Sequence, residues 1–268
     1  MNPSSATDGS TALDASPGGL ADRIAWRARD HHPVTVATVL AFLGFVVMGA
    51  VIVGLGLLLT HVLLSGALGR WDERVNEWFV TQRTTSLNTI TSFGTTIGST
   101  GTVVAVAAIT VVVLAIRKLW REVGLIVIAL SVEVLVFLMT TVIVNRPRPT
   151  VVRLDPSPPT SSFPSGHTAA AIALWVSLAI VISMHVRNAA VRTLVWLVAL
   201  GLPVFVGLSR LYRGMHHPTD VMASVLLGAG ALVTALLAVR AASAVAEIRR
   251  SPEALDSTTE PTRVGVAS

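Results

Sequence analysis

Residues 209–220 place two arginines, two histidines and a carboxylate between two long apolar stretches. Charged groups at or near a bilayer are costly and by default indicate a functional site. His216 and Asp220 are four residues apart, which puts them on one face of a helical turn. A carboxylate there can accept the proton of one ring nitrogen and leave the other free as a nucleophile. We therefore predict a nucleophilic His216 oriented by Asp220, with His217 pointing elsewhere as a bystander.

A second polar stretch, Pro-Ser-Gly-His at residues 164–167, precedes another apolar segment. Ser165 is a good helix N-cap, and free backbone N–H groups with the positive end of the helix dipole favour an anion at such a start. Gly166 allows a phosphate oxygen to approach the backbone closely. Taken alone, the tetrapeptide is better explained by an ordinary capped helix than by a catalytic site.

Arginines complete the set of candidate anion ligands. Arg148 lies between two prolines, and Arg210 precedes His216 by six residues. A guanidinium is a rigid fork of donors that suits phosphate oxygens. Arginine is also an ordinary headgroup anchor at a membrane interface, but that alternative explains Arg148 less well. The three stretches together predict a phosphate site on one face of a membrane.

The composition defines the elements that must position these groups. The chain of 268 residues is 52% hydrophobic and 13% charged, with a mean hydropathy of +0.70. Soluble domains carry about 25% charged residues, so the sequence indicates an integral membrane protein. The chain has no cysteine, which excludes disulfides and thiol chemistry. The net charge is +5, but the basic residues are not interleaved with aromatics in a stripe, which argues against a nucleic-acid partner.

Six apolar segments predict an all-α bundle of about six transmembrane helices. They are residues 35–64, 101–116, 123–144, 165–184, 191–208 and 221–239. We divide the chain into a disordered N-terminal tail (1–33), a six-span membrane domain (34–242) and a polar C-terminal tail (243–268). Six spans put both termini on one side, and that side carries twelve of the twenty lysines and arginines. The positive-inside rule then predicts cytoplasmic termini and an extracytoplasmic site.

Two further features leave alternatives open. Residues 71–79 show aromatic and apolar residues at helical spacing opposite acidic ones. They predict either an interfacial helix that borders the site or a plain connector with aromatics at headgroup level. Glu133 is a lone carboxylate within a predicted span. It could pair with an arginine, but a helix-packing hydrogen bond is the favoured interpretation.

These stretches resemble the three motifs of the type 2 phosphatidic acid phosphatase superfamily. That superfamily also includes vanadium haloperoxidases and bacterial undecaprenyl-pyrophosphate phosphatases. Arg148-Pro149 is similar to its first motif and residues 164–167 to its second. The third, Ser-Arg-x5-His-x3-Asp, matches Ser209, Arg210, His216 and Asp220 at every fixed position.

The resemblance implies a membrane enzyme that hydrolyses a lipid phosphate or pyrophosphate without a metal or other cofactor. It makes His216 the nucleophile that forms a phosphohistidine, with Asp220 orienting its ring. It makes His167 the acid that protonates the leaving oxygen. The implied ligands of the phosphate oxygens are Arg148, Ser165, Gly166 and Arg210. Polyprenyl pyrophosphate and phosphatidic acid-type lipids all fit, and the motifs fix neither the headgroup nor the oligomeric state.

The sequence departs from the first motif, Lys-x6-Arg-Pro, because Thr141 stands where the lysine is expected. Arg146, Arg153 and Arg213 are the candidate substitutes for the missing cation. Losing a charge contact in the transition state costs a few kcal/mol, or roughly 10²-fold in rate. The alternative function is therefore a weakly active or non-catalytic lipid-phosphate-binding membrane protein. A haloperoxidase would use the same residues to hold vanadate, but six apolar spans favour a lipid substrate.

Overall fold

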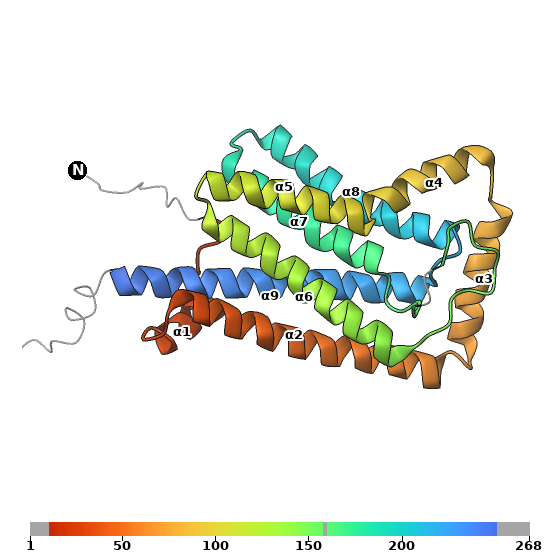
Figure 1. Ribbon diagram of the computed structural model, residues 1–268, viewed down its shortest axis with the longest axis horizontal. Coiled ribbons are helices and arrows are strands. Elements are labelled where there is room, and N and C mark those ends of the chain that lie inside the picture. The colour runs from red at the N-terminus through yellow and green to blue at the C-terminus, as the bar shows by residue number, and fades with distance from the viewer. Residues whose placement is uncertain (1–10, 158–159, 251–268) are drawn as a thin grey trace, which may run out of the picture. The chain divides into compact units, whose positions relative to one another are not determined.

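The computed structural model describes residues 11–157 and 160–250, and this part of the chain is entirely helical. Figure 1 shows the helices in order along the chain. They are α1 (Leu20–Arg27), α2 (Pro33–Leu58), a π-helical segment (Leu59–Leu63), α3 (Ala67–Thr81), α4 (Thr85–Ile97), α5 (Thr100–Ile116), α6 (Trp120–Val144), α7 (Gly166–His185), α8 (Ala189–Tyr212) and α9 (Pro218–Arg250). The predicted all-α membrane fold is confirmed.

Five of the described helical segments are long and apolar enough to cross a membrane: α2 with the π-helical segment, α6, α7, α8 and α9. The sixth predicted span differs from the structure. Helix α5 has 17 residues and becomes a candidate span only together with α4, from which it is bent by 46°. The polar threonines and serines of α4 hid this helix from a search for apolar runs, although Thr84 caps it by accepting from the Leu87 N–H.

The predicted tails are partly helical. Helix α1 lies within residues 1–33, where the sequence predicts disorder, and α9 continues eight residues into the predicted polar tail. Residues 1–10 and 251–268 lie outside the described part. The chain divides into two compact units, residues 1–40 with 237–268 and residues 41–236. In the first unit, α1 buries Ala21 and Ala25 in a small apolar cluster with Ala241 and Val245.

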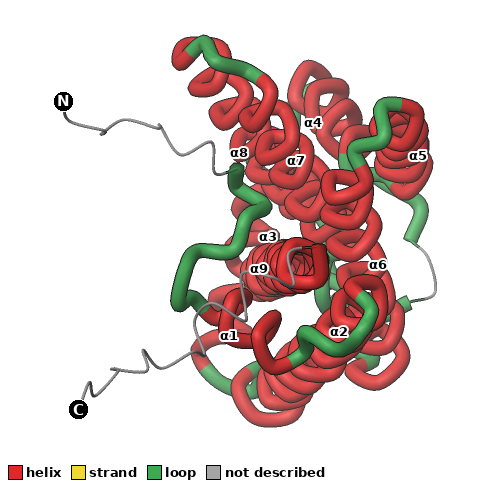
Figure 2. Tube along the Cα trace, turned by 90° about the vertical axis from the view of Figure 1, so that its left-hand side faces the viewer, coloured by secondary structure: helices red, strands yellow, loops and turns green. Residues whose placement is uncertain are grey.

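The second unit contains all the predicted site residues. Its helices α5, α6 and α7 run side by side, and Figure 2 shows the same helices nearly end-on. An apolar core cluster joins residues of α2, α6, α7 and α9, including Ile52, Val136, Ala169 and Leu227. Helix α6 ends at Asn145, whose left-handed conformation (φ 42°) is one that asparagine tolerates. The loop from there to α7 lies at the end of the bundle crossed by α3 (Figure 1).

Helix α3 is oriented with its polar side inward. Asp72 and Asn76 are both fully buried, whereas Trp71 and Trp78 are 39% and 56% exposed. The helix is held beside α8 by edge-to-face packing of Phe79 on Tyr212, with ring centroids 6.4 Å apart. Of the two alternatives for residues 71–79, the structure supports a helix that borders the site. Asp72 faces the site because it binds the buried Arg146 there, and Glu73 reaches His217.

Candidate active site

One cavity of about 880 Å³ connects the three motifs. At one end it is lined by Arg148 from the first motif, Gly166 and His167 from the second, and Arg210 and His216 from the third. The rest of its wall comes mainly from α5 and α6. The structure therefore brings together five of the residues that the sequence singles out, although they lie up to 68 positions apart.

The described residues leave part of the donor set of both cavity-lining arginines unpaired. Arg148 donates from Nη1 to the Met215 carbonyl at 2.8 Å, and Arg210 donates from Nη1 to Asp155 Oδ2 at 3.0 Å. The Nε–H groups of Arg148 and Arg210 are buried and have no hydrogen-bond partner within the described residues. A phosphate or similar anion would supply acceptors for such groups.

His216 is oriented by a backbone carbonyl. Its Nδ1 lies 2.7 Å from the carbonyl oxygen of Ser162 and 3.8 Å from Asp220 Oδ2. The Ser162 carbonyl, in the loop before α7, thus lies nearer to Nδ1 than Asp220 does, and the role of Asp220 as acceptor of the ring proton stays a prediction. Burial lowers the pKa of His216 to about 4, the nearby Arg210 and Arg148 lower it too, and Asp220 opposes them. A neutral ring whose Nδ1–H donates to Ser162 leaves Nε2 as a free lone pair.

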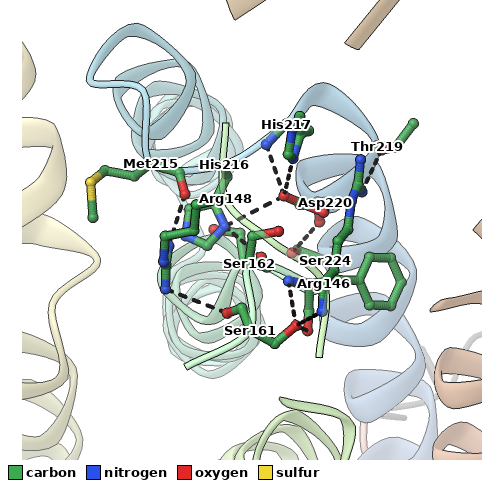
Figure 3. Close-up of polar contacts among 12 residues, drawn as sticks. Arg146, Arg148, Ser161, Ser162, Met215, His216, His217, Thr219, Asp220 and Ser224 are labelled. Atoms are coloured by element: carbon green, nitrogen blue, oxygen red, sulfur yellow. Dashed lines mark hydrogen bonds and ion pairs between the residues drawn. The ribbon is translucent and has the colours of Figure 1, made fainter. Parts of the chain in front are cut away.

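Asp220 is bound instead by a buried arginine (Figure 3). Arg146 donates from Nη1 to Asp220 Oδ1 at 2.5 Å and from Nη2 to Asp72 Oδ2 at 2.7 Å. Thr219 connects the same groups, since its hydroxyl donates to Asp72 Oδ2 at 2.6 Å and accepts from Arg146. The side chains of Arg146, Asp72 and Asp220 are all at most 1% exposed. We call these three residues and Thr219 the Arg146 cluster. Because its two carboxylates occupy Arg146, this arginine is not a substitute for the missing lysine.

His217 is not a bystander. Its backbone N–H donates to Asp220 Oδ2 at 2.8 Å, as expected where an acidic residue in the first helical turn reaches back to the helix start. Its Nδ1 lies 3.3 Å from the same oxygen, and its Nε2 lies 3.3 Å from Glu73 Oε1 of α3. The ring therefore bridges α3 to the start of α9. The prediction failed because the residue precedes the regular helix, so helical spacing did not apply to it.

Asp155, in the loop before α7, also lines the cavity and was not predicted from the sequence. It pairs with Arg210 at 3.0 Å and with Arg213 at 2.6 Å. Burial raises the pKa of the Asp155 carboxyl. The hydrogen bond from Arg213 and the charges of Arg213 and Arg210 lower this pKa by more than burial raises it, so the net shift is downward. Arg213 is thereby occupied away from this cavity, and Arg153 is exposed outside it. Neither takes the place of the lysine, and Arg148 and Arg210 are the cations of the described cavity wall.

Three other predicted residues lie beside the cavity rather than on its wall. Thr141 is buried in α6 and donates to the Leu138 carbonyl of its own helix. Ser209 donates to the Phe205 carbonyl in the same way. Ser165 precedes α7 as predicted, but its hydroxyl bonds Thr168 Oγ1 at 3.0 Å and does not cap the helix. For these side chains, roles in phosphate binding stay predictions.

The residues missed from the sequence share one property. Asp72, Glu73 and Asp155 are acidic residues in segments without a motif, and each binds a motif residue at least 55 positions away. The available signal was the amphipathic pattern of residues 71–79, which singled out an acidic face. It could not show that this face turns toward a buried arginine.

Comparison with known proteins finds similarity to one superfamily. Residues 122–244, which include all three motif stretches, match the PAP2 superfamily. Undecaprenyl-diphosphatase BcrC of Bacillus subtilis (strain 168) is 39% identical over 94 residues, which are 33% of this chain and 43% of that protein. The match thus spans less than half of that relative.

A solved structure shares the fold. The crystal structure of a transmembrane PAP2 type phosphatidylglycerolphosphate phosphatase from Bacillus subtilis superposes with a TM-score of 0.56 at 24% sequence identity. The superposition covers 87% of this chain and all of that chain. The chain is therefore a multi-pass integral membrane protein with a PAP2-type helical fold.

Proposed function

We propose that this protein is a membrane lipid phosphatase that hydrolyses a lipid phosphate or pyrophosphate through a phosphohistidine. The observation that carries the proposal is the convergence of His216, His167, Arg148 and Arg210 on one cavity wall. The similarity to an undecaprenyl-diphosphatase and to a phosphatidylglycerolphosphate phosphatase supports a lipid substrate. Uncatalysed phosphate-monoester hydrolysis is among the slowest reactions known, so a dense set of aligned groups suits it.

In the first step, Nε2 of His216 attacks phosphorus while Nδ1–H stays hydrogen-bonded to the Ser162 carbonyl. The bond from phosphorus to the lipid oxygen breaks, and His167 gives its proton to that oxygen. Asp220, 3.8 Å from Nδ1, stabilises the positive charge that develops on the His216 ring. The products of this step are the dephosphorylated lipid and the phosphohistidine.

In the second step, water attacks phosphorus, and His167 takes up its proton. The bond between phosphorus and Nε2 breaks, which releases inorganic phosphate and regenerates His216. Arg148 and Arg210, with the backbone N–H of Gly166 at the start of α7, hold the equatorial oxygens in both steps. Ser165 and Ser209 belong to the matching motifs, and each directly precedes a residue of the cavity wall, Gly166 and Arg210 respectively.

We also propose that the site faces the extracytoplasmic side, with both termini in the cytoplasm. The distribution of lysine and arginine supports this orientation. Modification of single cysteines introduced at exposed loop positions, which is clean in a chain without native cysteine, measures it directly. Labelling of Arg153→Cys by an impermeant reagent in intact cells is expected, and labelling only after cell lysis would reverse the orientation.

The test of the activity is phosphate release by the detergent-purified protein in the presence of EDTA. The substrates are undecaprenyl pyrophosphate, phosphatidic acid and phosphatidylglycerophosphate. We expect wild-type activity with at least one of them and a loss on the order of 10⁴-fold or more in His216→Ala, because the nucleophile is removed. His185→Ala is the matched control, since it removes an imidazole at the end of α7, outside the cavity wall, and leaves the nucleophile. Binding of these lipids without turnover by folded protein would replace the enzyme with the lipid-phosphate binder.

A further inference from the structure

Beyond the phosphate end, the cavity is walled by apolar side chains of α5 and α6, and one carboxyl interrupts this wall. The apolar residues include Val104, Ala108, Val127 and Leu130, and the carboxyl is that of Glu133. Glu133 is 3% exposed. Apart from Asp155 at the phosphate end, it is the acidic residue of the cavity wall in the part of the chain that the structure describes.

No described residue forms a hydrogen bond or ion pair with the Glu133 carboxyl. The favoured interpretation of Glu133 as a helix-packing hydrogen bond is therefore wrong, and the alternative pairing with an arginine is absent from the described residues. A buried polar group without a partner costs free energy, and a carboxyl at membrane depth is costlier still. Since the side chain borders the cavity, a bound molecule can reach it there.

The depth of Glu133 below the phosphate end follows from the helical register. Phe137 packs close to Gly166, because a Cβ added to that glycine would lie 2.8 Å from the Phe137 ring. Glu133 is four residues before Phe137, so it lies roughly 6 Å further along α6. Ala170, four residues after Gly166 on α7, lines the cavity as well. A lipid whose phosphate is bound at Gly166 thus presents the atoms nearest its phosphate to Glu133.

We propose that Glu133 binds a glycerol-derived oxygen of the substrate and makes the site selective for glycerolipid phosphates over polyprenyl phosphates. The proposal rests on the lipid phosphatase function above. A glycerolipid carries hydroxyl or ester oxygens within a few bonds of its terminal phosphate. A carboxyl group accepts from such a hydroxyl and, when protonated, donates to an ester oxygen. A polyprenyl phosphate carries only hydrocarbon there and would leave the carboxyl unpaired. A site built to bind a polar group discriminates strongly against an analogue that lacks it.

The test compares kcat/KM for phosphatidic acid, phosphatidylglycerophosphate and undecaprenyl phosphate in mixed micelles. Wild-type protein should prefer the glycerolipids. In Glu133→Leu, the ratio of glycerolipid to polyprenyl activity should fall by roughly 10- to 100-fold. Glu133→Gln keeps hydrogen-bonding capacity in the same shape and should retain most of the preference, which also covers the case of an unstable leucine variant.

Glu122→Leu is the matched control. Glu122 is a second buried carboxyl of α6, 3.9 Å from His185 and outside the cavity wall, so its loss should leave the substrate ratio unchanged. If the activity ratio of Glu133→Leu fell only for phosphatidic acid, the partner of Glu133 would be an ester oxygen. If it fell only for phosphatidylglycerophosphate, the partner would be the headgroup hydroxyl. An unchanged ratio in Glu133→Leu, or a wild-type preference for the polyprenyl substrate, would overturn the proposal while leaving the phosphatase intact. Inactivity of wild type on all three lipids would instead overturn the phosphatase itself.

Discussion

Arg146 and Arg148 are two residues apart in one Arg-Pro-Arg-Pro run, yet the structure gives them opposite surroundings. Arg146 is 2% exposed and donates to the carboxylates of Asp72 and Asp220. Arg148 lines the cavity and bonds mainly to backbone carbonyls, while the Nε–H groups of both arginines lack a partner among the described residues. Arg146 therefore connects buried residues of the fold, whereas Arg148 faces the cavity in which we propose that the ligand binds.

Arg146 is less available to a substrate than Arg148, because both of its terminal nitrogens already donate to buried carboxylates, whereas those of Arg148 donate to backbone carbonyls and a hydroxyl. Arg146 faces two buried carboxylates, so its charge is more than compensated within the fold. Burial lowers the pKa of Arg148, and the Asp220 charge opposes that shift from a distance. The comparison predicts that substitutions at the two positions separate into a stability defect and a rate defect.

The largest effect is expected from Arg146→Leu. This change leaves the carboxylates of Asp72 and Asp220 buried and uncompensated, which should lower the free energy of unfolding by about 3–5 kcal/mol. The thermal midpoint in detergent, measured beside exposed Arg153→Leu in the same loop, checks it. The control should stay within about 0.5 kcal/mol of wild type. A stable Arg146→Leu protein with lower activity alone would remove the distinction between the two arginines.

A comparable or somewhat smaller effect, on rate instead of stability, is expected from Arg148→Ala. Removing a donor that acts on the transferred phosphoryl group should lower kcat by roughly 10²- to 10³-fold. The thermal midpoint should stay closer to that of wild type than in Arg146→Leu. Arg148→Lys, which keeps the charge but loses the fork, should recover only part of the rate. If KM rose in Arg148→Ala while kcat stayed constant, Arg148 would bind substrate without stabilising the transition state.

The smallest effect concerns the pH dependence of stability. It arises at His216, whose pKa Arg148 and Arg210 both lower. Its folded pKa of about 4 lies below the usual value near 6.5. Above about pH 6.5 both folded and unfolded states are neutral there. As pH falls from 6.5 to 4, the unfolded state binds a proton that the folded state excludes, so wild type loses stability. Relative to non-titrating His216→Gln, the loss should reach about 3 kcal/mol in total.

The difference in thermal midpoint between these two proteins, followed from pH 8 to pH 4, measures this effect. It should be constant at the alkaline end and move against wild type on acidification. A difference that moved in favour of wild type would mean that the folded site binds the proton, as it would if Asp220 were the direct partner of Nδ1.

Most of the framework was predictable because it depends on local pattern and on solvent. Long apolar runs specify membrane helices wherever they occur, and five of the six predicted spans appear as single helical segments. Helix α4 was missed because its threonines and serines satisfy their hydroxyls within the helix, as Thr91 does toward Leu87, so polarity did not prevent helix formation. Helix α9 ran past its predicted end because apolarity marks the extent of a span and not the extent of a helix.

Residue types and their spacing along the chain were enough to predict the membrane bundle and the groups that meet in the cavity. His167, His216, Arg148 and Arg210 were recognisable from residue type and spacing within motifs. Tertiary structure alone decided the partners: Ser162 for His216, Asp72 for Arg146 and Asp155 for Arg210. The physical reason is that a motif records which groups the chemistry needs, whereas a hydrogen-bond partner is whichever acceptor the packing of distant segments brings within about 3 Å.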